Sequence, residues 1–471
     1  MNRSNIWIHI GLAVVLVMLA AVVGQIERWK SSLRSTPSRT ESVDTASASK
    51  TRALAGTPEV LVRFKLGANL DVIRAIAAER NDVVTDEIEA VSRLVEINDL
   101  DDASPETVAA EYAALDLVEY AEPNYRINLD DPATVPRQKI RGERIGTAST
   151  PDDPLFADQW ALNNSGRDGG TARADLDALQ AWEKTKGDSD VVIAVLDTGV
   201  DYTHVDLREN MWIRPANIPA YTDDELGTYN DLNGFNGTDR SADPMDDNGH
   251  GTHCAGIIGA EGNNGEGITG INWTVKIMPL KFLGRGGSGN TDDAIEAINY
   301  AIDRKKKGVN IRVISASWGS TQRSKALEDT IRAAGEAGIL FVAAAGNDGS
   351  DNDKRPHFPS NYDLPNLISV AALDRNDKLA SFSNFGNRSV QIAAPGKDIL
   401  STWLNNGYRE ASGTSMATPY VSGIAALVIA AEPAITMEKL RAKLLSSADQ
   451  LDQLSGKIAS GGRICAANAT N

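Results

Sequence analysis

Val191-Val192-Ile193-Ala194-Val195-Leu196-Asp197-Thr198-Gly199 is the stretch of this sequence that decides the fold. Its first six residues are all apolar, which is typical of a strand that is buried on both faces of a parallel sheet. A carboxylate, Asp197, follows at the carboxyl end of that strand. Open α/β sheets bind their ligands at this edge. The stretch therefore predicts a parallel sheet with an acidic residue at its functional edge.

Strand and helix patterns alternate through the rest of the C-terminal two thirds of the chain. Further strands are predicted at 276–280, 311–315, 339–344, 367–371 and 390–393, with helices at 292–304 and 325–337. Such alternation predicts parallel strands with helices on both faces. The expected class for residues 151–471 is therefore α/β, with a doubly wound, mostly parallel sheet.

Residues 57–126 show a different and smaller pattern. Strands are predicted at 59–66, 83–88, 93–97 and 118–125, and helices at 69–80 and 104–115. The second helix has a strong start signal in Ser104-Pro105-Glu106, which supplies a cap, a proline in the first turn and an early acid. The order β-α-β-β-α-β predicts a ferredoxin-like α+β unit.

The N-terminus has the composition of a targeting element. Arg3 precedes an apolar run from about Ile6 to Val23, which predicts a signal peptide or a membrane anchor within residues 1–30. Residues 31–56 are rich in Ser, Thr, Ala and Arg and are interpreted as a linker. Residues 127–150 contain Pro and Arg and are interpreted as a second linker. Most of the chain is therefore expected to leave the cytoplasm.

Charge and cysteine content narrow the class of protein. The formal net charge of the 471 residues is −17, which argues against nucleic acid as a partner. The two cysteines, Cys254 and Cys465, do not make a disulfide framework, although a single bridge stays open. Cys254 is interpreted as a buried thiol that packs as a small apolar residue.

Two short segments supply a nucleophile and a base. Gly413-Thr414-Ser415-Met416-Ala417-Thr418-Pro419 places Ser415 at the start of an apolar helix, where backbone N–H groups face incoming negative charge. A plain helix cap is the alternative for that serine. Asn248-Gly249-His250-Gly251-Thr252-His253-Cys254-Ala255-Gly256 places His250 at the start of a helix of small residues. Because no glutamate stands between His250 and His253, the zinc pattern H-E-x-x-H is missing.

The chain order Asp197, His250, Ser415 is the order found in subtilisin. The motifs VLDTGVD, HGTHCAG and GTSMATP resemble the three signature blocks of the subtilisin-like serine proteases. A fourth block, Ala343-Ala344-Ala345-Gly346-Asn347, resembles the oxyanion-hole segment of that family. The resemblance extends from about residue 150 to the C-terminus. More weakly, residues 57–126 resemble the family's inhibitory propeptide, with the maturation cut expected in the following connector.

The resemblance implies a catalytic role for each of these residues. Ser415 would attack the peptide carbonyl, His250 would take its proton, and Asp197 would orient the imidazole. The side-chain amide of Asn347 and the backbone N–H of Ser415 would hold the oxyanion. A turn residue after a glycine is the alternative for Asn347.

Substrate is expected to lie as an added strand between two walls. The resemblance assigns one wall to Ser317, Trp318 and Gly319, and the other to Gly287, Ser288 and Gly289. Trp318 departs from the family, in which smaller aliphatic residues are usual at this position. A core aromatic and a residue that contacts substrate are equally open interpretations of Trp318.

Residues 263–270 resemble the calcium loop of the family. The implied ligands are the Asn264 side chain, the carbonyl groups of Gly262, Glu266 and Ile268, and the carboxylate of Asp206. Mixed carboxylate and carbonyl shells suit Ca²⁺. The acidic stretch 239–247 is a second candidate for calcium, with a solvated loop as the alternative.

The leading hypothesis is a serine endopeptidase that is made as a self-processing zymogen with its own propeptide as inhibitor. It would act on proteins or peptides, either secreted to the extracellular space or periplasm or anchored at a membrane. A peptide transacylase or cyclase would share the acyl-enzyme and differ in the acyl acceptor. An inactive scaffold that binds peptides is a third class of function.

Overall fold

The computed structural model describes residues 59–130, 150–223 and 227–471. The predicted targeting element at 1–30, the predicted linker at 31–56 and residues 131–149 lie outside the described residues. The described residues belong to one compact unit.

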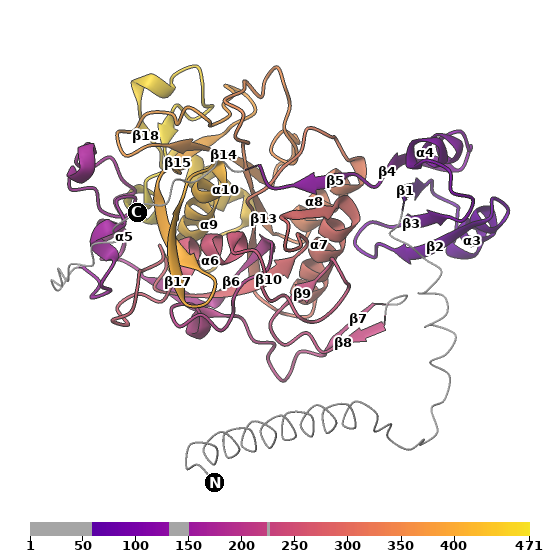
Figure 1. Ribbon diagram of the computed structural model, residues 1–471, viewed down its shortest axis with the longest axis horizontal. Helices are drawn as coiled ribbons and strands as arrows, with labels where there is room; N and C mark the ends of the chain where they lie inside the picture. The colour runs from indigo at the N-terminus through magenta and orange to yellow at the C-terminus, as the bar shows by residue number, and fades with distance from the viewer. Residues whose placement is uncertain (1–58, 131–149, 224–226) are drawn as a thin grey trace, which may run out of the picture. The chain divides into compact units, whose positions relative to one another are not determined.

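The largest sheet among the described residues has nine strands, in the order β18-β19-β15-β14-β13-β12-β6-β10-β9 (Figure 1). The bounds are β6 Gly187–Asp197, β9 Phe235–Asn236, β10 Thr274–Lys281, β12 Ile311–Ala316, β13 Leu340–Ala344, β14 Leu367–Leu373, β15 Ile392–Pro395, β18 Asp449–Gln450 and β19 Gly462–Arg463. Every neighbouring pair is parallel except β18 and β19. The predicted mostly parallel sheet is confirmed.

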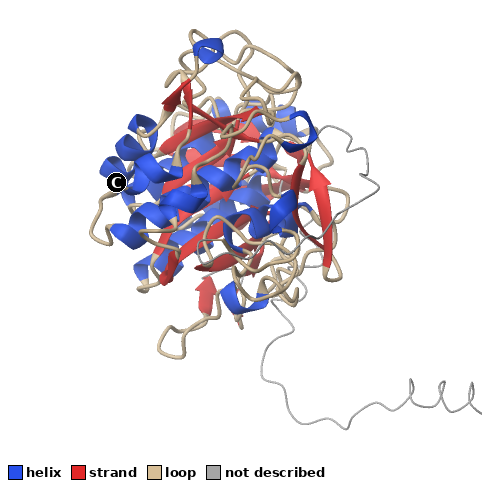
Figure 2. Ribbon diagram, turned by 90° about the vertical axis from the view of Figure 1, so that its left-hand side faces the viewer, coloured by secondary structure: helices blue, strands red, loops and turns tan. Residues whose placement is uncertain are grey.

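Both faces of this sheet are covered, and β6 shows why residues 191–196 are all apolar. Ile193 and Val195 pack into one hydrophobic layer, whereas Ala194 and Leu196 pack into the layer on the other face. The first layer contains helices α6 (His250–Gly259) and α9 (Thr414–Ala431), and the second contains α7 (Thr291–Lys306) and α8 (Lys325–Glu336). Figure 2 shows the strands enclosed between helices.

The strand order reverses next to β6. After β6 the chain adds β10 on one side and then crosses to add β12, β13 and β14 on the other. Such a switch point opens a crevice at the carboxyl ends of the strands, where α/β proteins bind their ligands. Asp197 ends β6, and the loops that follow β12 and β13 contain Ser317 and Asn347.

Residues 60–123 form a second, antiparallel sheet with strand order β2-β3-β1-β4. Its elements are β1 Val60–Phe64, α3 Leu70–Ala78, β2 Asp82–Glu87, β3 Leu94–Asp99, α4 Pro105–Ala113 and β4 Val118–Pro123. Asn69 and Ser104 cap the two helices with their side chains, as the sequence signals indicate. The structure therefore has the predicted β-α-β-β-α-β order. The start of β3 is one residue later than predicted because Arg93 has a φ of +63°.

Several strand pairings were not predicted from the sequence. Residues Arg126–Asn128 form strand β5, which pairs antiparallel with β11 (Ser288–Asn290). The first residues of the predicted linker at 127–150 are therefore part of a two-stranded sheet with residues 288–290. A hairpin of β16 (Ile399–Trp403) and β17 (Gly407–Ala411) also went unnoticed. The β5 pairing has no local signal, because its partner lies about 160 residues away. The hairpin is local, and the turn residues Asn405, Asn406 and Gly407 are a signal that could have indicated it.

Shorter elements complete the unit: α5 Ala178–Ala181, β7 Tyr221–Asp223, β8 Gly227–Tyr229, α10 Met437–Ser446 and α11 Ala466–Thr470. Among the described residues, α9 is the one helix whose length and composition would suit a membrane span. Its side chains are almost all buried in the hydrophobic layer on the sheet, which accounts for its apolar composition.

Candidate active site

Asp197 and His250 are joined by a short hydrogen bond. His250 Nδ1 lies 2.7 Å from Asp197 Oδ1, which also accepts the backbone N–H of Thr198 at 2.7 Å. Because a carboxylate only accepts, Nδ1 is the donor, and the bond fixes the imidazole tautomer and orientation. Gly251 makes this approach possible, since a Cβ there would lie 2.0 Å from the carbonyl oxygen of Gly199.

Ser415 is the second residue of α9, and two hydrogen bonds tie it to Ser317. Ser415 Oγ donates to the Ser317 carbonyl at 3.0 Å, and Ser317 Oγ donates to the Ser415 carbonyl at 2.9 Å. Pro419, four residues further on, has no N–H to offer that carbonyl. Cys254 Sγ is a second donor to it at 3.6 Å. Because Cys254 lies one turn after His250, this contact brings the starts of α6 and α9 together.

Asn347 is oriented by the first residue of α9. Its Oδ1 accepts the backbone N–H of Thr414 at 2.8 Å and the Thr414 hydroxyl at 3.1 Å. The amide nitrogen is therefore directed away from the helix, and Nδ2 donates to Asp130 Oδ1 at 3.4 Å. Gly346 precedes it with a φ of +103°, a conformation that favours glycine.

Asp246 organises the loop before α6, and the sequence analysis did not single it out. Its Oδ1 accepts from the Thr198 hydroxyl at 2.9 Å and from the Gly249 N–H at 3.0 Å. Its Oδ2 accepts from the N–H and hydroxyl of Thr252 at 3.0 and 2.6 Å. Burial raises the pKa of Asp246, and these hydrogen bonds oppose that shift. The carboxylate thus links the Asp197 loop to the start of the His250 helix.

Other carboxylates of the acidic stretch 239–247, the second candidate for calcium, also have partners within the protein. The oxygens of Asp246 accept N–H and O–H donors, and Asp243 accepts the Tyr202 hydroxyl and the Met245 N–H. Asp247 pairs with the buried Lys281 at 2.7 Å. Hydrogen bonds and an ion pair therefore fix these three carboxylates in place.

The two predicted walls lie on opposite sides of one strand, β5 and the residue after it. Ser288 and Gly289 pair with Asn128 and Ile127, and Gly287 accepts the N–H of Leu129 at 2.8 Å. On the other side, Asn128 makes an antiparallel bridge to Gly319. Ser317 contacts Ser415, as described above, rather than the strand.

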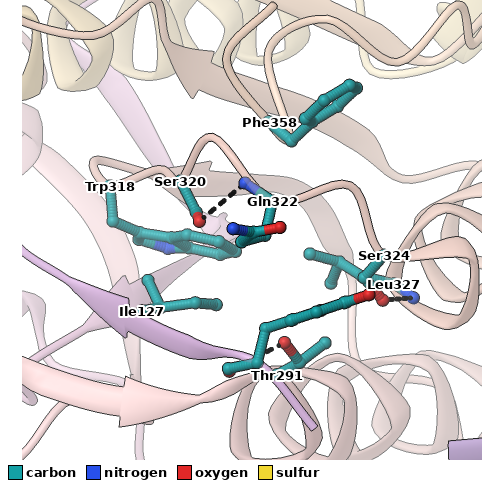
Figure 3. Close-up of a pocket in the computed structure, with 9 residues that line it drawn as sticks. Ile127, Thr291, Trp318, Ser320, Gln322, Ser324, Leu327 and Phe358 are labelled. Carbon is teal, nitrogen blue, oxygen red and sulfur yellow. Dashed lines mark hydrogen bonds between the residues drawn. The ribbon is translucent and has the colours of Figure 1, made fainter. Parts of the chain in front are cut away.

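Trp318 packs in the core, which is one of the two interpretations that the sequence left open. Its ring is buried, packs on Phe282 with a centroid distance of 4.6 Å, and donates from Nε1 to the Leu196 carbonyl at 2.9 Å. It also lines a small pocket of about 10 Å³, together with Ile127 from β5 and Thr291 (Figure 3).

The predicted calcium loop surrounds two buried carboxylates. Asp206 accepts the Asn264 amide and the Ile268 N–H, each at 2.9 Å. Asp153, which the sequence analysis missed, accepts the Asn263 N–H at 2.8 Å from the same loop. Burial, together with the neighbouring charge of Asp153, raises the pKa of Asp206 to about 7, and burial raises that of Asp153 to about 6.

Two buried acids beside a loop of backbone carbonyls, including those of Gly262 and Glu266, suit a hard cation. The cation would offset the repulsion between the two acids, so the residues present fit calcium. Asp153 has no local signal in the sequence, because it is more than 100 residues from the loop.

His253 and His204 are bonded to backbone carbonyls. His253 Nε2 lies 2.9 Å from the Arg409 carbonyl and 3.1 Å from that of Ile399, and burial lowers the pKa of His253 to about 3. His204 Nε2 lies 3.0 Å from the Gly407 carbonyl. Both histidines therefore anchor the β16–β17 hairpin, and His253 does not share a site with His250.

Comparison with known proteins identifies the family. The subtilase family matches residues 188–461. A thermophilic serine proteinase of Bacillus sp. (strain AK1) is 36% identical over 378 residues, which cover 79% of this chain and 77% of that protein. Thermitase of Thermoactinomyces vulgaris is 36% identical over 302 residues, 64% of this chain and 92% of that protein. Cell wall-associated protease of Bacillus subtilis (strain 168) is 36% identical over 305 residues, 64% of this chain and 31% of that protein.

The family match covers more than half of the chain, and the first two relatives are matched over most of their length. With its mostly parallel, doubly wound sheet, the chain belongs to the subtilase family and is a subtilisin-like serine endopeptidase.

Proposed function

We propose that Asp197, His250 and Ser415 form the catalytic triad and that Asn347 stabilises the oxyanion. The observation that carries this proposal is the 2.7 Å bond from His250 Nδ1 to Asp197, on a helix whose next turn contacts Ser415. A carboxylate on Nδ1 makes the opposite nitrogen of the ring the base. The orientation of the Asn347 amide, with its oxygen held by Thr414, supports a donor role for Nδ2.

The reaction proceeds in two halves. Ser415 Oγ attacks the peptide carbonyl carbon while His250 takes the hydroxyl proton, and the oxyanion forms beside Asn347. The C–N bond then breaks, and His250 returns the proton to the leaving amine. Water attacks the resulting ester, loses its proton to His250 and releases the carboxylic acid, which restores Ser415. Asp197 stays ionised and orients the imidazole throughout.

Residues 57–126 serve as an intramolecular inhibitor in this proposal, because their contacts hold helices of the peptidase region. Glu122 caps the start of α8 by accepting from the Ser324 hydroxyl at 2.5 Å and from the Lys325 N–H at 2.8 Å. Asn124 accepts the N–H of Asp292 in the first turn of α7 at 3.1 Å. These acceptors satisfy helix N–H groups that have no partner inside the helix.

A third contact, the Arg240 cluster, consists of Arg240, Asp86, Glu96, Asp292 and Glu296. The Arg240 guanidinium lies 2.6 Å from Asp86, 2.7 Å from Glu96 and 3.4 Å from Asp292. Asp86 and Glu96 come from the small sheet, whereas Arg240 and Asp292 come from the peptidase region. From these contacts the chain leads through β5 into the cleft, which supports inhibition by blocking the substrate site.

Substrate would take the place of β5 between Gly287–Gly289 and Gly319. The same backbone pairing would bind any extended peptide, and the Trp318 pocket would accept an apolar side chain in the position of Ile127. The proposed enzyme is thus an endopeptidase for extended protein segments that carry an apolar residue at that position.

Calcium is proposed at the loop 262–268, with Asp206, Asn264 and the carbonyl groups of Gly262, Glu266 and Ile268 as ligands. Asp153 would be a further ligand. The ion would neutralise two buried acids and so stabilise the native loop. We also propose that the enzyme acts outside the cytoplasm, secreted or anchored at a surface, as its targeting-like N-terminus indicates.

Labelling by a fluorophosphonate tests the proposed nucleophile. Wild-type protein should form a one-to-one adduct at Ser415 and hydrolyse labelled casein, and Ser415→Ala should do neither. Ser446→Ala is a matched control, because it removes an exposed hydroxyl of helix α10 that lies outside the proposed site and leaves Ser415 and its partners in place. An adduct on any other serine would overturn the assignment.

A further inference from the structure

The strand in the cleft ends beside the proposed oxyanion residue. Leu129 donates its N–H to the Gly287 carbonyl, and Asp130 is the next residue. The two carboxylate oxygens of Asp130 face different donors. Oδ1 accepts from Asn347 Nδ2 at 3.4 Å, and Oδ2 lies 3.6 Å from His357 Nε2. Asp130 is therefore in contact with a residue that we place in the catalytic machinery.

His357 is fixed in the wall of the cleft, and the sequence analysis did not single it out. Its side chain is 5% exposed. The ring lies against two glycines, since a Cβ on Gly319 would approach it to 1.9 Å and a Cβ on Gly346 to 3.0 Å. Asn361 accepts the backbone N–H of His357 at 3.0 Å. Both glycines belong to the proposed substrate site, so the histidine is built into that site and is not a mobile surface group.

The two ring nitrogens of His357 have different surroundings, which determine where its proton lies. Nδ1 is buried and has no hydrogen-bond partner among the described residues, whereas Nε2 faces the Asp130 carboxylate. A proton on Nε2 is the favourable arrangement, because it gives the carboxylate a donor and leaves a lone pair, rather than an N–H, buried at Nδ1.

We propose that His357 selects an acidic side chain in the residue whose carbonyl carbon Ser415 attacks, and that Asp130 is this residue when the chain processes itself. The inference rests on the proposed function and adds the substrate class to it. A carboxylate accepts from Asn347 Nδ2 at one oxygen and places its negative charge 3.6 Å from His357 Nε2 at the other, where the attraction is electrostatic. An Asn side chain would carry no charge and would turn an NH₂ group toward one of these donors. An apolar side chain would offer neither an acceptor to Asn347 nor a charge to His357.

The self-processing step follows from this placement. Ser415 Oγ bonds to the carbonyl carbon of Asp130, and the amide bond on the carboxyl side of Asp130 breaks. The proton taken by His250 passes to the new amino group, and water then releases the Asp130 carboxylate from the ester. The segment that ends at Asp130 would remain in the cleft as a bound product.

The test uses quenched fluorescent peptides with the sequence of residues 124–130 followed by Ala-Ala-Ala, and variants with Asn, Glu, Leu or Lys in place of Asp130. The self-processed protein should cleave the Asp peptide with a kcat/KM at least about tenfold above that for the Asn peptide. Mass spectrometry should place the cut after Asp. In His357→Gln the ratio of the two kcat/KM values should fall toward one.

His204→Gln is the matched control, since it removes a buried histidine that contacts a backbone carbonyl away from the cleft. It should keep the wild-type ratio. Fluorophosphonate labelling of each variant reports whether Ser415 is still competent, so a misfolded variant is recognised and replaced by His357→Asn. An enzyme that labels and cleaves casein but prefers Asn or Leu would overturn the acidic preference alone. An unchanged ratio in His357→Gln and His357→Asn would also overturn it. Absence of both labelling and casein cleavage would overturn the proposed function as well.

Discussion

Two buried acidic regions of this protein stabilise their carboxylates in different ways. At the active site, Asp246 is surrounded by N–H and O–H donors from Thr198, Gly249 and Thr252. In the Arg240 cluster, one guanidinium faces several carboxylates, which come from the small sheet and from helix α7. Burial raises the pKa of Glu96 to about 7, and burial with the nearby charge of Glu96 raises that of Asp86 to about 9.

The two regions differ in how stable their contacts are once the carboxylates are ionised. A carboxylate that is held by neutral donors is stable at all pH values where it is ionised, because its partners carry no charge to lose. Carboxylates that outnumber the available cation repel one another once they ionise. The Asp246 network therefore suits a site that must persist in the active enzyme. The Arg240 cluster suits a contact that the proposed proform makes and the mature enzyme releases.

The largest effect is expected from breaking the Asp246 network. Asp246→Ala would leave several buried donors without an acceptor, at about 1–3 kcal/mol each, and would free the start of the His250 helix. We expect activity to fall by more than about 100-fold and the free energy of unfolding to fall by at least about 3 kcal/mol. Asp247→Ala, in the neighbouring half-exposed acid, is the control, and thermal melts with casein assays measure both. Equal effects of the two variants would contradict the role of Asp246 in linking the Asp197 loop to the His250 helix.

Asn347→Ala removes one hydrogen-bond donor from the region that must persist in the active enzyme, namely the proposed oxyanion donor. Loss of an oxyanion donor should reduce kcat by about 100- to 1000-fold, with a much smaller change in KM. Steady-state kinetics on a peptide substrate decides this. A variant with normal kcat and a raised KM would show that Asn347 binds substrate without stabilising the transition state.

The sequence predicts the central region well because its signals are local. The apolar run of β6, the helix starts at His250 and Ser415, and the order of the motifs were all visible along the chain. Asp246 and His357 were missed because their partners come from other segments. The role of Asp246 appears only in the fold, where the Asp197 loop and the start of the His250 helix lie together. The role of His357 likewise depends on the two glycines against which its ring packs.

The predicted calcium loop is intermediate between the Asp246 network and the Arg240 cluster. There a bound ion would balance the negative charges of Asp206 and Asp153. An ion at 100 times its dissociation constant stabilises the native state by about 2.7 kcal/mol. We expect the melting temperature of wild-type protein to fall when a chelator replaces calcium. In Asp206→Ala most of that difference should vanish, because the central carboxylate is gone. Equal calcium-induced shifts in the two proteins would place the ion elsewhere.

The smallest expected effect is a pH dependence of the proform. Because the pKa values of Glu96 and Asp86 lie above the ordinary carboxyl range, the assembled chain binds more protons than the unfolded chain. The free energy of unfolding should therefore fall as pH rises through about 7 to 9. In the Ser415→Ala background, Asp86→Asn should flatten this slope, and melting temperatures from pH 6 to 9 measure it. A slope equal to that of the parent would remove Asp86 as a cause.

The strand in the cleft, β5, is the part of the site that could not be predicted from the sequence. The sequence named both walls, Gly287–Gly289 and Gly319, from the resemblance alone. It could not show that residues 126–130 of the same chain lie between them, because a three-residue strand carries no periodicity. Trp318 was ambiguous for a related reason, since a buried ring can pack in the core and line a pocket at the same time.

Self-processing of the full chain tests the central claim most directly. Purified wild-type protein and Ser415→Ala are incubated separately in calcium, and the masses of their fragments are followed with time. The account predicts that wild type releases a fragment ending in the connector after residue 126, at a rate independent of protein concentration, while Ser415→Ala stays intact. An intact wild-type chain that nevertheless hydrolyses casein, or a Ser415→Ala chain that matures without added protease, would contradict it.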